Sequence, residues 1–304
     1  MLLMKKKNKM KLILIVNPNS GGGKGLRIQK KIQPLFDKSG ISLKIINTEY
    51  AGHAKELAQT LDFSNFNGIC PIGGDGTMHE VINGMMLRED KMKIPIGLIT
   101  GGTGNSFMHD LDLVDPLESV KAIIKGKTQM IDIVDLRLKN KKLYIFNIIG
   151  WGLVTDAGIT AEYLRWLGHS RYTLGAAIEV IKKKKRYARL VLDDIVFEDD
   201  FLFIIACNTI HTGKGMMMAP RAILNDGLMD VVVVKDASRL ELFNLLPKVF
   251  NGSHVSHPKL DYYQVEKFAI ENSNNDILNI DGEINGITPF RSEVVPSAIE
   301  VFVR

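Results

Sequence analysis

The stretch Gly73-Gly74-Asp75-Gly76-Thr77 decides the fold, because it joins an apolar run at 68–72 to a segment with helical periodicity at 77–87. The same change from apolar run to helical pattern recurs along residues 12–125. The other apolar runs are 12–16, 43–47 and 95–100, and the other helical patterns are 24–38 and 53–61. This alternation predicts an α/β fold, with a parallel sheet covered by helices on both faces.

Two further glycine-rich turns follow apolar runs in this half, at residues 17–25 (NPNSGGGKG) and 101–105 (GGTGN). The carboxyl ends of parallel strands meet at one edge of a sheet, where ligands bind. Glycines let backbone N–H groups approach a polyphosphate, and the helix start that follows adds favourable partial charge. The three loops together predict a phosphate site at this edge.

These loops do not match the common phosphate motifs. Gly23-Lys24-Gly25 lacks the hydroxyl residue that a P-loop needs, and His79 stands where a Rossmann fingerprint needs its third glycine. The H-R-D and D-F-G sequences of protein kinases are absent. Asp75 is a carboxylate among glycines, which suits a magnesium ligand or a base for an attacking hydroxyl. An N-cap for the following helix is the alternative, and the two roles are compatible.

Length and composition fit one large domain or two ordinary domains of a folded protein. The chain has 304 residues, 45% hydrophobic and 24% charged. Its net charge of +5 is uneven, since residues 1–130 hold 18 of the 39 basic residues and only 12 of the 34 acidic ones. Such a basic half suits an anionic partner such as nucleotide, nucleic acid or membrane headgroups. Cys70 and Cys207 lie in apolar runs, which predicts buried free thiols and a reducing compartment.

The N-terminus imitates a signal peptide, with five lysines from residue 5 to residue 11 before the apolar run at 12–16. Five apolar residues are too few for a secretory core. No other segment approaches the roughly 18 apolar residues of a membrane span. We therefore expect a protein that is neither secreted nor transmembrane.

The motifs, taken in order, resemble those of the diacylglycerol kinase/sphingosine kinase superfamily. The GGDGT loop with HEVINGM at 79–85 is similar to the nucleotide loop and first helix of that family. GGDGT alone also occurs in NAD kinases and some phosphofructokinases, so the ordered set carries the resemblance. The matching segments are 17–18, 48–54, 73–85, 102–105, 151–156, 165–172, 225–230 and 281–283.

The lysine-rich residues 1–11 are expected to form a basic tail. The resemblance implies an α/β nucleotide-binding domain at 12–130 and a larger β-sandwich domain at 131–304. In the family the last strand returns to the first domain. Apolar runs support the second domain independently, and one helical stretch is expected at 160–182. The expected strands are 131–138, 143–149, 189–196, 201–207, 229–235, 262–270, 276–281 and 298–303.

The function implied is that of a lipid kinase, which uses ATP and Mg²⁺ to phosphorylate a hydroxyl of a sphingoid base, ceramide or diacylglycerol. An NAD kinase-like enzyme and a catalytically silent, nucleotide-gated lipid-binding protein are the alternatives. Asp75 would be the catalytic base or magnesium-linked carboxylate, and Glu283 a second carboxylate near the phosphates. Arg165 and Arg171 would reach the transferred phosphate, where a guanidinium suits the spread charge.

Further residues take their expected roles from the same resemblance. Asp156 would contact the lipid head, but Gly158 replaces a second acidic residue, which favours ceramide- or diacylglycerol-like alcohols over a free amine. The helix at 78–86 is nevertheless closer to that of sphingosine kinases, so the acceptor stays open. Asp226 and Asp230 match a loop that holds structural magnesium in some relatives, with a plain turn as the alternative. The expected nucleotide contacts are Asn17, Ser20, Gly22, Thr48, Gly73, Gly74, Gly76, Thr77, Gly102, Thr103, Gly104 and Asn105.

Because the expected substrate is a membrane lipid, we expect the protein to be cytoplasmic and peripheral at the membrane. The lysine tail and the basic run at 182–186 are candidate contacts to anionic headgroups, although a solvated helix end explains the second equally well. A homodimer is one alternative for the assembly. Motifs that read nucleic acid are absent from the sequence, so no nucleic-acid partner is expected.

Overall fold

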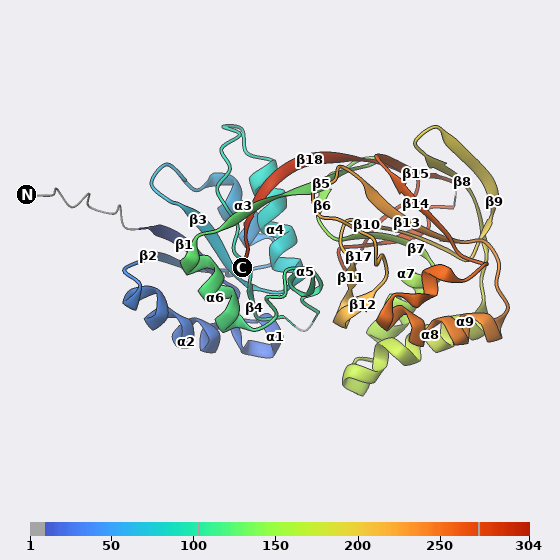
Figure 1. Cartoon of the computed structure of the whole chain (residues 1–304), viewed down its shortest axis with the longest axis horizontal. Helices are drawn as coiled ribbons and strands as arrows, with labels where there is room; N and C mark the ends of the chain where they lie inside the picture. The colour runs from blue at the N-terminus through green and yellow to red at the C-terminus, as the bar shows by residue number, and fades with distance from the viewer. Residues whose placement is uncertain (1–9, 103, 273) are drawn as a thin grey trace, which may run out of the picture. The chain divides into compact units, whose positions relative to one another are not determined.

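The structure of the protein is a computed structural model that describes residues 10–102, 104–272 and 274–304. The lysines of the tail before residue 10, and Thr103, therefore lie outside the described residues, as do the side chains of Arg165, His169 and Lys214. The chain forms two compact units (Figure 1). The first ends at Met130 and includes Ile299–Arg304, and the second is Ile131–Ala298.

The first unit contains a parallel sheet in the strand order β2-β1-β3-β4. Every residue of β3 is buried, and so is every residue of β1 after Lys11, as expected for a sheet with helices on both faces. The α/β prediction is confirmed. The strands are β1 (Lys11–Val16), β2 (Ser42–Asn47), β3 (Gly68–Gly73) and β4 (Ile99–Thr100).

The helices of this unit follow the strands and agree with the sequence patterns at 24–38 and 53–61. The helix expected at 77–87 begins two residues earlier, because Asp75 and Gly76 already have helical backbone. Asp115 caps α6, where its carboxylate accepts a hydrogen bond from Leu117 N at 2.6 Å. The helices are α1 (Ser20–Gly23), α2 (Gly25–Lys38), α3 (His53–Thr60), α4 (Asp75–Met86), α5 (Ser106–Asp110) and α6 (Pro116–Lys125).

The strand expected at 95–100 is mostly wrong, since only Ile99–Thr100 forms β4. Before it, Ile96 makes single bridges to Ile69 and Val301. Pro95 has no N–H to donate to a ladder, and the chain packs too tightly for a side chain at Gly97, where a Cβ would lie 2.7 Å from Ile123. The bridge to Val301 places the last residues of the chain beside this sheet.

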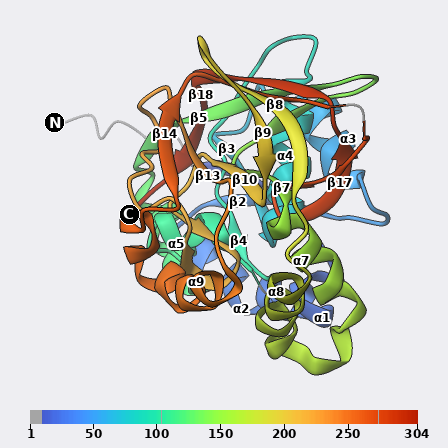
Figure 2. The same ribbon diagram turned by 90° about the vertical axis from the view of Figure 1, so that its right-hand side faces the viewer.

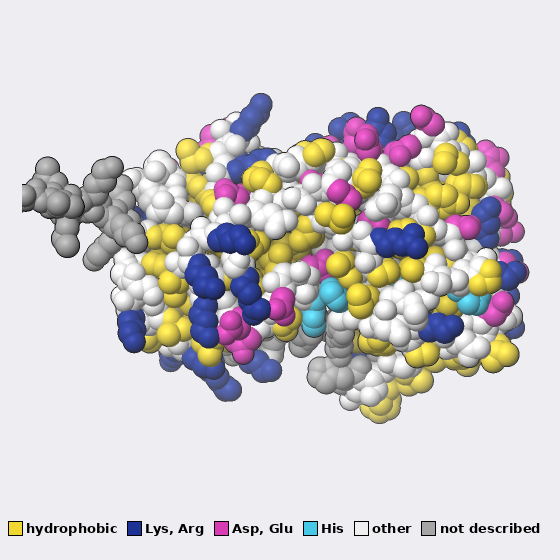
Figure 3. All heavy atoms as spheres, viewed as in Figure 1, with side chains coloured by type: hydrophobic (Ala, Val, Ile, Leu, Met, Phe, Trp, Pro, Cys, Tyr) yellow, Lys and Arg dark blue, Asp and Glu magenta, His cyan; other side chains and the backbone are white. Residues whose placement is uncertain are grey.

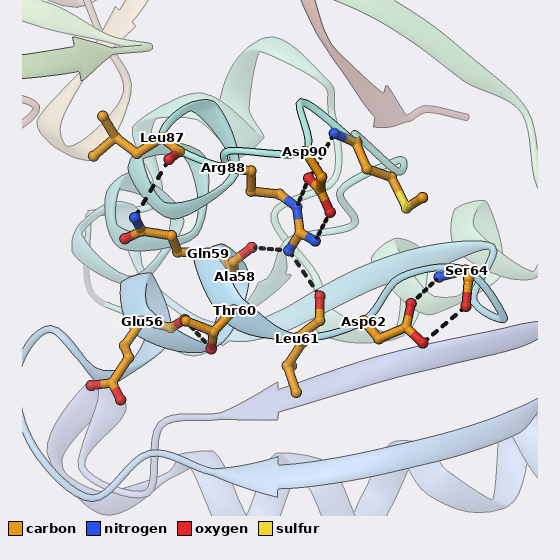
Figure 4. Close-up of polar contacts among 11 residues, drawn as sticks. Glu56, Ala58, Gln59, Thr60, Leu61, Asp62, Ser64, Leu87, Arg88 and Asp90 are labelled. Carbon is orange, nitrogen blue, oxygen red and sulfur yellow. Dashed lines mark hydrogen bonds and ion pairs between the residues drawn. The ribbon is translucent and has the colours of Figure 1, made fainter.

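Helices α3 and α4 pack against each other at close range (Figure 4). A Cβ at Gly84 would lie 2.8 Å from the Cβ of Ala58, so only glycine allows this approach. Arg88 then closes the C-terminal end of α3, where its Nη1 donates to the carbonyl oxygens of Ala58 at 3.0 Å and Leu61 at 2.8 Å. Its Nε and Nη2 bind the Asp90 carboxylate at 2.8 and 2.5 Å.

The second unit is built on two antiparallel sheets, in the orders β14-β13-β10-β7-β16-β17 and β6-β5-β18-β15-β8-β9. Apolar side chains of both sheets, Trp151 and Phe268 among them, pack into one core, which confirms the predicted sandwich. β5 and β18 continue from this unit into the first. The strands are β5 (Thr128–Leu138), β6 (Lys142–Ile145), β7 (Ile148–Gly152), β8 (Arg186–Leu192), β9 (Ile195–Phe201), β10 (Phe203–Cys207), β11 (His211–Thr212), β12 (Met216–Met217), β13 (Met229–Val234), β14 (Asp261–Val265), β15 (Lys267–Glu271), β16 (Ile277–Ile280), β17 (Glu283–Ile287) and β18 (Phe290–Phe302).

Three helices cover the outer face of the sheet that contains β7, β10 and β13, and a second apolar cluster lies between this sheet and the helices. The helices are α7 (Leu153–Tyr163), α8 (Arg171–Lys182) and α9 (Arg239–Leu245). The single helix expected at 160–182 is wrong, because α7 and α8 form a hairpin joined by a 3₁₀ segment at Arg165–Ser170 (Figure 2). The two helices approach closely at Gly175, where a Cβ would lie 2.8 Å from Ala157 O. No helix in the described ranges is long and apolar enough to cross a membrane.

Three of the expected strands are in fact pairs of strands. The run 143–149 spans β6 and β7, which belong to different sheets. The run 189–196 spans β8 and β9, which turn at Asp193 with a φ of +50°. The run 262–270 spans β14 and β15, which belong to different sheets. In each case the apolar pattern continues across the break, so the sequence did not mark the turn. Cys70 and Cys207 are buried free thiols, as predicted.

Candidate functional site

The three glycine-rich loops of the first unit contact one another at the carboxyl edge of the parallel sheet. Gly73 O accepts hydrogen bonds from Gly101 N at 2.7 Å and Gly102 N at 3.2 Å. A Cβ on Gly102 would lie 2.6 Å from the Cα of Gly74, and one on Gly21 would lie 2.1 Å from Gly101 O. Side chains are thus excluded where the loops meet, and backbone forms the surface that a phosphate could approach.

The start of α4 is open to an anion. Gly74 is the N-cap, and as a glycine it has no side chain that could cap the helix. Gly76 and Thr77 lie in its first turn, and the Thr77 hydroxyl fits only because residue 73 is glycine, where a Cβ would lie 2.3 Å from Oγ1. Unsatisfied N–H groups and the helix dipole favour a phosphate at such a terminus.

Asp75 does not cap α4, contrary to the alternative considered from the sequence. It is the first residue of the helix, and its Oδ2 accepts a hydrogen bond from Ser106 N, the first residue of α5, at 3.0 Å. A Cβ on Gly104 would lie 3.0 Å from the same oxygen. Asp75 as a residue is partly exposed, although its Oδ1 atom is buried, and its carboxylate bridges the second and third loops at this edge.

The other predicted nucleotide contacts surround these loops. Asn17 Nδ2 donates to Thr77 Oγ1 at 3.4 Å, and Ser20 Oγ would lie 3.1 Å from a Cβ on Gly101. Thr48 follows β2 and donates its N–H to Val16 O at 2.8 Å. Gly22 has a φ of +75°, a conformation that favours glycine.

Asn105 has a notable environment in the third loop. Its backbone is left-handed, with a φ of +51°, and its Nδ2 donates to Gly102 O at 3.1 Å. Its Oδ1 is buried and has no hydrogen-bond partner among the described residues. Because an unpaired buried acceptor is costly, this oxygen is ready to take a donor from a bound molecule or water.

In the second unit, Glu283 is exposed at the start of β17, directly after the Asp281–Gly282 turn. Asp281 is much more than a turn former. It is 2% exposed, and its carboxylate accepts hydrogen bonds from the N–H groups of Phe146, Asn147 and Ile148 at 3.4, 2.8 and 3.1 Å. This anchor, which holds the turn against the start of β7, had no signal in the sequence beyond the Asp-Gly pair.

Arg171 begins α8 and is committed to neighbours on its own hairpin. Its Nη2 donates to the Tyr172 hydroxyl at 2.7 Å and lies 3.4 Å from a Glu162 carboxylate oxygen. The guanidinium also stacks 4.7 Å from the Tyr172 ring centre. Arg165 lies in the 3₁₀ segment, and its side chain is outside the description.

Asp156 is held in an ion pair that the sequence did not indicate. Both of its carboxylate oxygens lie 2.9 Å from Arg186 Nη2, and Arg186 Nε reaches Asp276 at 3.3 Å. Trp151 Nε1 donates to Asp276 at 3.3 Å as well. The side chains of Arg186 and Asp276 are only 10% and 15% exposed. Sequence spacing could not reveal the cluster, because its members come from α7, β7, β8 and the residue before β16.

Asp226 and Asp230, the predicted magnesium ligands, have different surroundings. Asp226 accepts a hydrogen bond from Leu228 N at 3.0 Å, as in a simple turn. Asp230 is 1% exposed and accepts from the Tyr262 hydroxyl at 2.6 Å, and burial raises the pKa of its carboxyl to about 6. No group of three or more His, Cys, Asp or Glu side chains is placed to hold a metal in the described ranges, so backbone carbonyls or water would have to complete a magnesium site.

Comparison with known proteins gives matches over nearly the whole chain. Residues 11–136 match the model of the diacylglycerol kinase catalytic domain, and residues 147–303 match that of the YegS C-terminal NAD kinase beta sandwich-like domain. Sphingosine kinase 1 of Arabidopsis thaliana is 27% identical over 90% of this chain and 68% of its own length. The diacylglycerol kinase of Staphylococcus saprophyticus is 28% identical over 95% and 94%. A solved structure from Bacillus anthracis str. Sterne superposes with a TM-score of 0.82 and 25% identity, covering 98% of this chain and 99% of that one.

Proposed function

The chain belongs to the family of lipid kinases that includes the diacylglycerol and sphingosine kinases, and we propose that it transfers the γ-phosphate of ATP to the hydroxyl of a membrane lipid. The observation that carries this proposal is the meeting of three glycine loops around Asp75 at the open start of α4. Backbone N–H groups there can hold the phosphates, and Asp75 is the carboxylate beside them.

Each residue has a defined part in this proposal. The loops and α4 bind and orient the phosphates of ATP. Asp75 takes the proton of the attacking lipid hydroxyl or holds Mg²⁺, whose charge would offset the negative charge of the phosphates. Glu283 is the proposed second carboxylate. Arg171 would stabilise the charge of the transferred group after release from Tyr172 and Glu162, and the same role for Arg165 rests on the family resemblance alone. Catalysis of this kind depends mainly on position and electrostatics.

For the acceptor we propose a lipid with an uncharged head, such as a diacylglycerol or a ceramide. The Asp156–Arg186 pair supports this choice, because both carboxylate oxygens of Asp156 already face a guanidinium and are less available to a lipid ammonium group, while Asp276 leaves the cluster with one net negative charge. Position 158 adds no second charge. A Cβ there would meet Ile284 at 3.4 Å and Asn279 at 3.7 Å, both uncharged side chains.

We also propose that the α7–α8 hairpin brings the protein to a membrane surface. Tyr163 and Trp166, near its tip, are 81% and 80% exposed, and the apolar residues Leu174 and Ile181 are exposed on α8. Apolar side chains are visible at the lower end of this hairpin in Figure 3. Aromatic residues of this kind suit the membrane–water interface. The basic run supports the proposal less, since Lys183 and Lys185 both pair with Asp236.

The test is a transfer assay with labelled ATP, Mg²⁺ and a panel of diacylglycerol, ceramide, sphingosine and NAD. Label in a lipid with an uncharged head is the expected result, and label in sphingosine alone would contradict the choice of acceptor. NAD is on the panel because the second half matches an NAD kinase-like model. Label in NAD alone would favour an NAD kinase-like activity. Nucleotide binding without transfer to any acceptor would favour the catalytically silent alternative.

A further inference from the structure

Glu80 is a partly buried carboxylate on α4 that binds the start of the neighbouring helix α3. Its Oε1 accepts a hydrogen bond from Gly52 N at 3.0 Å, and its Oε2 accepts one from Ala54 N at 3.1 Å. Gly52 is the N-cap of α3, and as a glycine it has no side chain that could cap the helix. Glu80 therefore does the work of a capping residue from another helix, and its charge lies at the positive end of the α3 dipole.

Glu80 is the first of three residues that hold α3 along one side of α4. Gly84 and Arg88 follow at intervals of four, which places Glu80 and Gly84 on one helix face, with Arg88 just beyond the end of the helix. Gly84 allows the close approach at Ala58, and Arg88 binds the carbonyls at the C-terminal end of α3. The acidic end of this series meets the N-terminus of α3 and the basic end meets its C-terminus, so both charges complement the dipole.

The two ends of the series lie at opposite edges of the parallel sheet. α3 and α4 each follow a strand, so their N-termini lie at the carboxyl edge, where the glycine loops meet, and their C-termini lie at the other edge. Six residues of helix separate Glu80 from Met86, the last residue of α4, a rise of about 9 Å, and Arg88 lies two residues beyond. Glu80 thus acts near the proposed phosphate site, whereas Arg88 acts far from it.

The segment from Thr48 to Ala54 crosses this edge and depends on Glu80 for its attachment to α4. At its beginning, Thr48 N is bound to Val16 O, at the end of β1. Inside the segment, His53 Nδ1 accepts from Glu49 N at 3.1 Å, a contact that is local to the loop. At its end, the two hydrogen bonds to Glu80 tie it to the helix whose own start is open to phosphate.

We propose that Glu80 is a positioning residue for nucleotide binding. It holds segment 48–54 against α4, and by occupying the N-terminus of α3 it leaves the N-terminus of α4 as the helix end that binds phosphate. The inference rests on the proposed function in one respect, namely that the ligand of the glycine loops is a nucleotide.

The test compares Glu80→Gln with Arg88→Met in the full chain. Glutamine keeps one acceptor oxygen but turns an NH₂ group toward the second backbone N–H, so one of the two hydrogen bonds is lost. Both variants weaken the hold on α3, and both are expected to lower the melting temperature. Only Glu80→Gln is expected to raise the Kd for Mg-ATP in direct titration, by about tenfold, because it displaces groups at the phosphate edge.

Kinetics sharpen the comparison. In the transfer assay Glu80→Gln is expected to raise the KM for ATP about tenfold with kcat changed less than threefold, and Glu80→Asp, which keeps the charge, to recover part of the affinity. Equal Kd values for wild type, Glu80→Gln and Glu80→Asp, or an equal rise in Arg88→Met, would show a merely structural role and overturn the inference. If Glu80→Gln does not fold, the Kd values of Glu80→Asp and Arg88→Met for Mg-ATP are compared instead. A higher Kd in Glu80→Asp alone would support the inference, and equal values would overturn it. A wild type that binds no nucleotide would contradict the proposed function itself, and the inference with it.

Discussion

The carboxylate of Asp156 is bound to the guanidinium of Arg186, with both carboxylate oxygens 2.9 Å from the same nitrogen. Arg186 also binds Asp276, so one buried cation serves two carboxylates. The pair joins α7 to β8, and it occupies both carboxylate oxygens of Asp156 with a guanidinium. The proposal that the lipid acceptor has an uncharged head rests on this contact.

A new carboxylate at position 158 is expected to change the choice of acceptor. In Gly158→Asp the added charge has no cation of its own, so phosphorylation of sphingosine should rise relative to diacylglycerol, by about tenfold in the ratio of kcat/KM. Gly158→Asn has almost the same shape without the charge and is the matched control. An equal change in both variants would mean that shape, and not charge, controls the acceptor.

Replacement of Asp75 is expected to slow transfer strongly while the fold persists. Asparagine retains an oxygen that can accept from Ser106 N, so the loops should stay in place. Loss of the base or magnesium ligand should lower kcat by about 10²–10⁴-fold. The measurement is kcat with saturating ATP and lipid, together with the melting temperature. Asp37→Asn, on the exposed side of α2, is the control, and full activity in Asp75→Asn would remove the catalytic assignment.

Arg88 is expected to matter for stability. Methionine keeps the apolar stem but leaves the carbonyls of Ala58 and Leu61 without their donor, in a place where the Arg88 side chain is only 4% exposed. The free energy of unfolding should fall by about 2 kcal/mol or more, as measured by urea denaturation. Arg137→Met is the control, because the Arg137 side chain is 67% exposed, and its effect should stay within about 0.5 kcal/mol.

The buried Asp230 is expected to make stability depend on pH. Burial raises the pKa of its carboxyl to about 6, above the value of about 4 in an unfolded chain. Between these values the folded state binds more protons than the unfolded state, so this carboxyl contributes stability at pH 4 that is lost as the pH rises through 6. Asp230→Asn cannot titrate, and its melting temperature relative to wild type should rise from pH 5 to pH 7. The exposed Asp261→Asn should show no such trend, and parallel profiles for wild type and Asp230→Asn would refute the assignment.

Membrane binding is expected to depend on the tip of the α7–α8 hairpin. Trp166→Ala removes an aromatic side chain that is 80% exposed, so it should weaken binding to liposomes several-fold and leave the melting temperature unchanged. Tyr187→Ala, on β8, removes a side chain that is 56% exposed and is the control. Retained liposome binding in the Trp166 variant, together with a loss in the Tyr187 variant, would move the proposed membrane surface to the sandwich.

Patterns within short segments predicted the elements of the first unit. The apolar runs and helical periodicity at 12–87 correspond to β1, β2 and β3 with α2, α3 and α4. Where one apolar pattern ran across a turn, as at Asp193, the sequence suggested one strand and the structure has two. The expected strand at 95–100 likewise has only two residues in β4, with a single bridge from Ile96 to Ile69 before it. Errors of this kind arise because a turn and a close contact depend on neighbours far away in the sequence.

The sequence by itself determined the fold class, the family and the loops of the phosphate edge, because glycine, aspartate and apolar spacing act over a few residues. The tertiary structure alone decided what individual charged side chains do. Asp75 reaches α5 instead of capping its own helix, and Asp281 anchors three backbone N–H groups. Glu80 caps α3 from 26 residues away, and Arg186 forms an ion pair with Asp156 from 30 residues away. A charge finds its partner by proximity in space, and only the packed helices and sheets bring such distant residues within hydrogen-bond distance.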